Sequence, residues 1–174
     1  MWKFVKQFIL HPRNTGSIVP SSPDLARAML APVDFSKANN IVELGPGTGA
    51  FTRLILTRMK KDAQLTVLEL NEEFCRGLEK IEDSRMKVIH GNAMELSSHV
   101  KNADYVISGL PLNSFSKKEH LAVLKEIKKI VKHAYIQFHY APLREELLKE
   151  NFPRISKKLV VKNIPPAIVY TARQ

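Results

Sequence analysis

The sequence predicts an α/β domain built on a mostly parallel sheet with a reversed last strand. From Ile41 to Asn151, short apolar runs alternate with helical patterns, which is typical of βαβ units. The chain then ends in two β-rich runs separated only by the turn "NIPP", which leaves no room for a crossover helix. A glycine-rich turn follows the first strand, where open α/β sheets bind ligands. At 174 residues, we expect a single domain, residues 1–174.

The first ten residues, 1–10, predict an amphipathic helix. At about 100° per residue, Trp2, Phe4 and Phe8 fall on one side, and Lys3 and Lys6 fall on the other. Aromatic residues opposite lysines suit the headgroup region of an anionic membrane. The same pattern fits a helix that packs on its own domain, so docking and membrane insertion both stay open.

Residues 11–23, "HPRNTGSIVPSSP", predict an irregular connector before a helix over Asp24 to Leu30. Ser21 and Ser22 can close over a bound cofactor as part of a lid. Alternatively, Ser22 can cap the helix, with Pro23 at the first helical position. The sequence leaves both interpretations open.

The remaining elements, residues 24–174, are expected to form the cofactor-binding core. Each predicted strand is followed by a helix or a turn before the next strand begins. The pairs are "NIVELG" with 50–60, "LTVLEL" with 71–81, "MKVIHG" with a short turn, "ADYVISGL" with 117–131, and "HAYIQFHY" with 144–151.

The stretch "VELGPGTGAF" marks the predicted ligand site. Its glycines, Gly45, Gly47 and Gly49, follow the pattern G-x-G-x-G and not the G-x-G-x-x-G of dinucleotide sites. A strand that leads through such a turn into a helix places backbone N–H groups at the carboxyl edge of the sheet. Pro46 contributes no N–H, which favours packing against an uncharged part of the ligand. Glu43 is expected near an ammonium group of the ligand or in holding the loop.

Two further polar residues point to a nucleoside. Glu69 ends the second predicted strand, 20 positions after Gly49, where a carboxylate can accept hydrogen bonds from both ribose hydroxyls. Asn92, in "GNA" after the third strand, can bond the edge of adenine or cap a helix, and both interpretations stay open.

Four motifs in this order, "VELGPGTGAFT", "VLELN", "GNA" and "SGLPL", resemble those of class I S-adenosylmethionine-dependent methyltransferases. The resemblance implies a Rossmann-like, seven-stranded, mostly parallel sheet with an antiparallel last strand. It also implies S-adenosylmethionine as the cofactor, with contacts from Leu70, Ala93 and Ser108, which belong to these motifs.

Two groups of these enzymes share the glycine loop but differ in the methyl acceptor. In ribosomal RNA adenine dimethyltransferases the fourth motif resembles N-L-P-Y or N-I-P-Y, whose amide grips the adenine amine and whose ring stacks on the base. Here the corresponding residues are Gly109, Leu110, Pro111 and Leu112. Both the amide and the ring are absent, so rRNA adenine N6-methylation is the less favoured alternative.

Over nearly its whole length the chain resembles the bacterial phospholipid N-methyltransferases. The matching stretches are "FILHPRNTGSIVPSSPDLARAM", "VELGPGTGAFT", "SGLPLNSF", "QFHY" and "NIPPAIVY". The resemblance implies N-methylation of phosphatidylethanolamine to the monomethylated and dimethylated lipids. It leaves open whether a third transfer gives phosphatidylcholine.

Tyr140, at the end of the predicted fifth strand, is the expected centre of the acceptor site. Its ring can hold a partly methylated ammonium by cation–π attraction. Tyr140, His139 or water can take the proton that the amine must lose. Phe115 and the carbonyls of residues 108–110 are expected to complete the pocket.

Basic residues near this site can bind a lipid phosphate. Arg144 and the pair Lys117 and Lys118 are the candidates. No metal is expected, because the six histidines lack the spacing of a ligand set.

Composition bounds the partners and the compartment. A net charge of +10 favours an anionic partner, either nucleic acid or an acidic membrane surface. The single cysteine, Cys75, and the lack of a membrane-spanning run indicate a cytoplasmic protein, placed by the resemblance at the inner face of the cell membrane. A lipid- or RNA-binding module without turnover is a third hypothesis, and the complete set of cofactor motifs argues against it.

Overall fold

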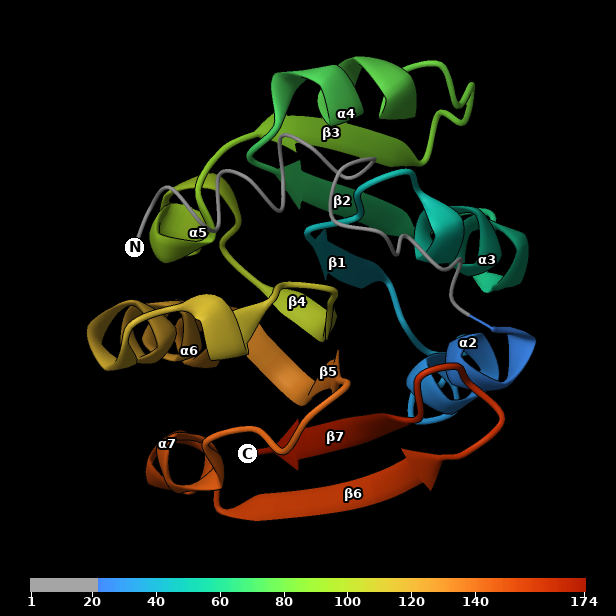
Figure 1. Cartoon of the computed structure of the whole chain (residues 1–174). Helices are drawn as coiled ribbons and strands as arrows, with labels where there is room; N and C mark the ends of the chain where they lie inside the picture. The colour runs from blue at the N-terminus through green and yellow to red at the C-terminus, as the bar shows by residue number, and fades with distance from the viewer. Residues whose placement is uncertain (1–21) are drawn as a thin grey trace.

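A computed structural model describes residues 22–174 as a seven-stranded sheet with helices on both faces (Figure 1). The strands are β1 (Asn40–Leu44), β2 (Gln64–Glu69), β3 (Met86–His90), β4 (Ala103–Ser108), β5 (Val131–His139), β6 (Arg154–Val160) and β7 (Ala167–Arg173). The α-helices are α2 (Pro23–Leu30), α3 (Ala50–Arg58), α4 (Glu72–Leu78), α5 (Leu96–His99), α6 (Lys117–Ile130) and α7 (Glu145–Asn151). Two 3-10 turns, η1 (Ala93–Glu95) and η2 (Leu112–Ser114), precede α5 and α6.

The sheet has the strand order β3-β2-β1-β4-β5-β7-β6. The five strands from β3 to β5 in this order pair in parallel, whereas β7 is antiparallel to both β5 and β6. The predicted fold class is therefore confirmed, including the terminal hairpin. The reversed strand β7 lies inside the sheet, and β6 forms its edge.

Two apolar cores lie on the two faces of the sheet. One core packs α2, α3 and α4 against the sheet through residues such as Leu25, Ile55 and Leu78. The other packs α5, α6 and α7 through residues such as Leu96 and Leu147. Figure 1 shows α2 and α3 on one side of the central strands and α5, α6 and α7 on the other. Because both faces are covered, the carboxyl edge of the parallel strands is the natural place for a ligand.

Local sequence signals explain where the helices begin. Ser116 and Glu119 form a capping box at the start of α6, which satisfies two N–H groups of the first turn. Ser22 accepts a hydrogen bond from Leu25 N at 3.1 Å, and Pro23 occupies the first position of α2. The capping interpretation of Ser22 is thus confirmed.

The element boundaries differ from the predictions by a few residues. The short turn expected after β3 contains η1 and the four-residue helix α5. The helix predicted over 71–81 is shorter at both ends, because Asn71 is its N-cap and Glu79 is its C-cap.

Several predictions concern residues outside the described range. They are the amphipathic helix over 1–10 with Trp2, Phe4 and Phe8, most of the connector, and Ser21. Within residues 22–174, no helix is both long and apolar enough to cross a bilayer.

Candidate active site

The glycine loop joins β1 to α3 at the carboxyl edge of the sheet. Gly45, Gly47 and Gly49 all have positive φ angles, of 64°, 55° and 80°. A side chain would strain the backbone in this left-handed region, so the turn requires glycine.

Close packing joins the glycine loop to the turn after β4. A β-carbon on Gly45 would lie 2.9 Å from Leu110 Cδ2, and one on Gly109 would lie 2.9 Å from the Gly45 carbonyl oxygen. Gly109 N also donates to Leu44 O at 2.9 Å. A β-carbon on Gly47, in contrast, would meet no atom of the described residues within 4 Å. The loop is therefore closed towards β4 and open at Gly47, where a ligand can approach the backbone.

Glu43 lies beneath this loop with one carboxylate oxygen unused. The residue is 1% exposed, and its Oε2 accepts a hydrogen bond from the Thr52 hydroxyl at 2.7 Å. Its Oε1 is buried and has no partner among the described residues. Burial raises the pKa of the carboxyl from 4.5 to about 7, and the nearby charge of Glu69 adds to this increase. A cation next to Oε1 would satisfy both the free oxygen and the charge.

Glu69, at the end of β2, anchors the neighbouring backbone. Its Oε1 accepts hydrogen bonds from the N–H groups of Leu70 and Asn71, both at 2.9 Å. Its Oε2 accepts from Gly47 N at 3.1 Å. These charge-assisted bonds fix the carboxylate beside the open side of the glycine loop, the position expected for the ribose acid. They use three of its four lone-pair positions, which leaves one, on Oε2, for a ribose hydroxyl.

Leu70, Asn92 and Ala93 flank the same edge. Leu70, directly after β2, exposes 38% of its surface next to Glu69. Asn92 accepts a hydrogen bond from Met94 N at 3.0 Å and so caps η1. Its amide NH₂ group is the part that can contact adenine, so the two interpretations of Asn92 are compatible.

Ser108 faces away from the glycine loop. It is fully buried, and its hydroxyl accepts a hydrogen bond from Leu110 N at 3.2 Å. Its neighbours are Tyr135 and Gln137, on the α6 side of the sheet. The side chain of Ser108 therefore shapes the turn, and the expected contact of Ser108 with the cofactor stays a prediction that its backbone would have to fulfil.

Gln137 is a site residue that the sequence did not single out. Its amide oxygen accepts from Tyr135 OH at 2.8 Å, and its amide nitrogen donates to Leu110 O at 3.1 Å. Leu110 O also accepts from Leu112 N. Both lone pairs of this carbonyl are therefore engaged, and Gln137 holds the turn. That the carbonyls of residues 108–110 complete the acceptor pocket stays a prediction.

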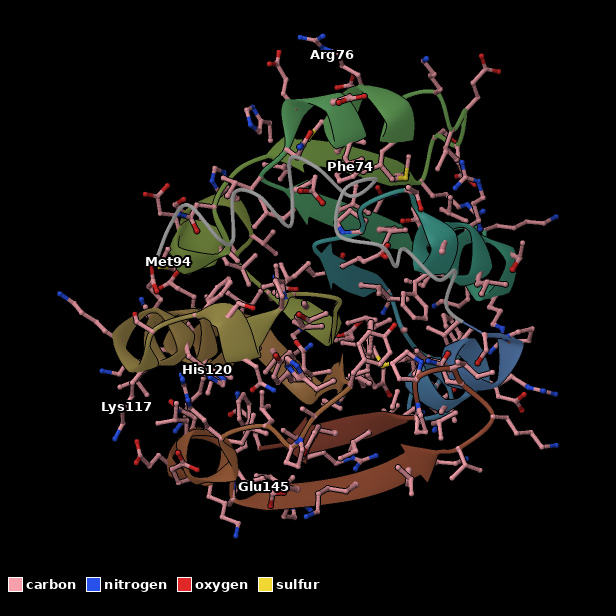
Figure 2. All side chains as sticks on the ribbon, viewed as in Figure 1. Phe74, Arg76, Met94, Lys117, His120 and Glu145 are labelled. Atoms are coloured by element: carbon pink, nitrogen blue, oxygen red, sulfur yellow. The ribbon has the colours of Figure 1, made fainter. Side chains whose placement is uncertain are left out.

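Two hydrogen bonds tie the turn after β4 to the loop after β5. Arg144 Nη1 donates to Phe115 O at 2.9 Å, and Asn113 Nδ2 donates to Pro142 O at 3.3 Å. Arg144 thus has a structural partner, whereas Lys117 points into solvent (Figure 2). The two loops that border the acceptor side are fixed to each other.

Tyr140, directly after β5, belongs to a row of three aromatic residues. Its ring meets Phe138 edge-on at 5.5 Å, and Phe138 lies 5.8 Å from Phe51 at the start of α3. Tyr140 is 46% exposed. Burial raises the pKa of its phenol, and a hydrogen bond with Asn163 acts in the opposite direction. The row runs from the glycine loop to an exposed, neutral tyrosine.

His139 points to the opposite face from Tyr140 and lies close to His120. Both histidines are buried, and both nitrogens of His120 and Nε2 of His139 lack partners among the described residues. Burial lowers the pKa of each to about 4. Figure 2 shows His120 on the side of α6 that faces α7. The pair is neutral near pH 7 and separate from the aromatic row.

These features fit S-adenosylmethionine. The free Oε1 of Glu43 suits the ammonium of the cofactor's methionine part, and Glu69 suits its ribose. The open space at Gly47 lets the cofactor approach the protein backbone. Among residues 22–174, no group of three or more His, Cys, Asp or Glu side chains is arranged to hold a metal ion.

Comparison with known proteins places this site in a family. Residues 17–134 match the family model described as ribosomal RNA adenine dimethylase. The ornithine lipid N-methyltransferase of Singulisphaera acidiphila is 29% identical over 180 residues, covering 98% of this chain and 94% of that protein. A demethylmenaquinone methyltransferase of Bacillus subtilis is 32% identical over 90 residues, but these cover only 49% of this chain and 38% of that protein.

Solved structures agree on the fold. Human N-acetylserotonin methyltransferase in complex with SAM has a TM-score of 0.68 at 15% identity, over 100% of this chain and 56% of that one. Magnesium protoporphyrin IX methyltransferase of Synechocystis with bound SAM has a TM-score of 0.67 at 13% identity, over 86% of this chain and 76% of that one. The chain is therefore an S-adenosylmethionine-dependent methyltransferase of class I fold, and it belongs to the ribosomal RNA adenine dimethylase family.

Proposed function

We propose that this protein methylates the amine of a membrane lipid headgroup, with phosphatidylethanolamine as the acceptor. The observation that carries the proposal is the match to a lipid N-methyltransferase over nearly the full length of both chains. The whole-length resemblance of the sequence to phospholipid N-methyltransferases supports the same class of acceptor.

Ornithine lipid is the second candidate, since that substrate is named for the S. acidiphila relative. Both headgroups carry a primary amine close to an anionic group. The acceptor site therefore needs one surface for an ammonium and one for an anion, whichever lipid it takes.

Tyr140 and Arg144 meet these two needs. The exposed ring of Tyr140 attracts a methylated ammonium through its π face, and Phe138 fixes that ring from the edge. Arg144 uses Nη1 for Phe115 O, which orients the guanidinium and leaves its other N–H groups for the anion of the headgroup.

Bound S-adenosylmethionine would supply an electrophilic methyl group on its sulfonium: the lone pair of a neutral amine would bond to that carbon as the C–S bond breaks, with S-adenosylhomocysteine as the leaving group. The residues of this chain contribute alignment and exclusion of water, since the two loops beside the site are tied together. Tyr140 keeps its own proton because its pKa is raised, and His139 binds a proton weakly because its pKa is lowered to about 4. Water therefore takes the proton that the amine loses.

Adenine in RNA is the alternative acceptor that the family name favours. Against it stands the fourth motif, where Gly109 and Leu112 replace the amide and the aromatic ring that would grip and stack on a flipped base. A binding module without turnover is the remaining alternative.

In the deciding experiment, purified protein is incubated with labelled S-adenosylmethionine and one of three acceptors: phosphatidylethanolamine vesicles, ornithine lipid vesicles or ribosomal RNA. Label in the phosphatidylethanolamine fraction is expected, and the masses of the lipid products count the methyl groups transferred. Label in RNA alone would refute the lipid proposal, and bound cofactor without any transfer would support the binding module.

The proposed site of action is the inner face of the cell membrane, reached from the cytoplasm. The amphipathic pattern of residues 1–10 and the charge of +10 support it. Deleting residues 1–10 should weaken binding to vesicles, and unchanged binding would remove this segment from the membrane contact.

A further inference from the structure

The end of β6 and the turn that leads to β7 expose three large aliphatic side chains. Leu159, Val161 and Ile164 are 61%, 66% and 78% exposed, more than any other large hydrophobic residue of the described chain. Pro165 and Pro166 beside them are exposed as well. We call residues 159–166 the hairpin tip. A cluster of exposed apolar residues at one point of a soluble surface marks an interaction site.

The hairpin tip is a fixed structure. Its polar centre, Asn163, is 1% exposed, donates to Pro165 O at 2.7 Å and accepts from Ser22 N at 3.0 Å. Val160 is also buried and joins the core under α2. The apolar side chains therefore point outward from a framework held by buried neighbours.

The strand register places the hairpin tip at the edge that carries the active site. His139 pairs with Ile168 across the antiparallel strands β5 and β7, and Val160 pairs with Ala167 across β6 and β7. The tip thus emerges where β5 ends, next to Tyr140, and the side chain of Asn163 reaches the tyrosine hydroxyl. Figure 1 shows the turn beside α2.

The charge of the residues around the hairpin tip indicates what kind of surface can bind there. Residues 152–174 contain five basic and no acidic residues: Arg154, Lys157, Lys158, Lys162 and Arg173. Lys157 is paired with Glu145, whereas Lys158 and Lys162 flank the apolar cluster and are exposed. Aliphatic side chains surrounded by lysines match a bilayer with anionic headgroups, where apolar groups enter the interface and lysines meet the lipid charge.

From this arrangement we infer that the hairpin tip inserts into the interface of an anionic phospholipid bilayer and thereby sets Tyr140 and the acceptor site against the headgroups. The inference deepens the proposed function and rests on it for the identity of the partner. RNA fits the tip less well, because single-stranded bases need aromatic or guanidinium planes to stack on.

The test compares V161D/I164D with wild type in sedimentation with vesicles of phosphatidylethanolamine and an anionic phospholipid. Partitioning should fall by about tenfold or more, because carboxylates replace apolar groups at the interface. I164D compared with L54D keeps the added charge equal: Leu54 is 36% exposed on α3 and L54D should keep wild-type partitioning, whereas I164D should lose part of it. K162A should weaken binding by about fivefold, whereas K61A, at the opposite edge of the sheet, should not.

A second measurement separates this inference from the proposed function. With short-chain phosphatidylethanolamine dispersed below its micelle concentration, V161D/I164D should turn over at the wild-type rate, whereas on vesicles its rate should fall together with binding. Wild-type partitioning of V161D/I164D would overturn the inference. A wild-type dimer that becomes a monomer in the variant would also overturn it, since a second copy of the chain would then cover the tip. If neither form of the lipid is methylated but vesicle binding is lost, the proposed function fails and the membrane contact stands. Circular dichroism checks folding, and V161S/I164S replaces the aspartate variant if that one unfolds.

Discussion

Replacing Glu43 with Gln tests whether the carboxyl under the glycine loop has a raised pKa and becomes ionised when a cation binds. The residue is buried, and its pKa is raised from 4.5 to about 7. Between those values the folded protein holds a proton that the unfolded chain has released. The carboxyl therefore contributes stability that is fully present below pH 4.5 and is lost as the pH rises through about 7.

The expected magnitude follows from that interval. The difference between 4.5 and about 7 is worth about 3 kcal/mol once the group is fully ionised. Between about pH 5 and about pH 8, wild type should lose about 2.5 kcal/mol of unfolding free energy relative to E43Q. The other titrating groups are present in both proteins and cancel in this comparison.

Urea unfolding of the cofactor-free proteins at both pH values measures this difference. T52V is the directional control: the Thr52 hydroxyl donates to the carboxylate and lowers its pKa, so its loss should shift the transition to higher pH. A difference between wild type and E43Q that does not change with pH would refute the reasoning.

Calorimetry of cofactor binding then tests the role of the charge. Near pH 6, binding of S-adenosylmethionine to wild type should release about one proton, because an adjacent cation favours the ionised carboxyl. E43Q should release none and bind about tenfold more weakly. Equal affinity and no proton release in wild type would show that Glu43 only supports the loop.

Three further predictions concern other buried polar groups. The lowered pKa of His120 means that the unfolded chain binds a proton between pH 6.5 and about 4 that the folded protein does not, so stability is lost as pH falls through this window. Relative to H120L, wild type should lose about 2 kcal/mol between about pH 8 and about pH 5, and a constant difference would contradict this. E69A leaves the N–H groups of Gly47, Leu70 and Asn71 without their acceptor and should abolish measurable cofactor binding, whereas unchanged affinity would remove Glu69 from the site. Q137L should cost about 2 kcal/mol of stability and raise KM for the lipid several-fold, while cofactor affinity stays within twofold of wild type. An equal loss of cofactor affinity would mean that Gln137 supports the whole carboxyl edge of the sheet.

The strands and the cofactor loop were predictable because their signals are local. Short apolar runs define β1 to β5, with a glycine directly after β1, β3 and β4, and the spacing of Gly45, Gly47 and Gly49 defines the loop. The position of Glu69 also follows, since a strand end fixes where its side chain emerges. Each of these inferences needs only a few neighbouring residues.

The orientation of Ser108 was not predictable, because β4 is buried on both faces. All six residues of this strand are buried, so the pattern of apolar residues carries no alternation that would assign Ser108 to one side. The roles of Gln137 and Asn163 were missed for a related reason. Their partners, Leu110 and Ser22, are distant in the sequence and are chosen by the fold.

The hydrogen bond between Ser22 and Asn163 joins residues 141 positions apart and therefore has a consequence for biosynthesis. During translation, α2 leaves the ribosome long before its anchor exists. The edge strand β6 must also wait, because its neighbour in the sheet is β7, which follows it in the chain. Proteins generally begin to fold from the N-terminus as they are made. Here the start of α2, the environment of Tyr140 and the outer strands can assume their final arrangement only after β7 has left the ribosome.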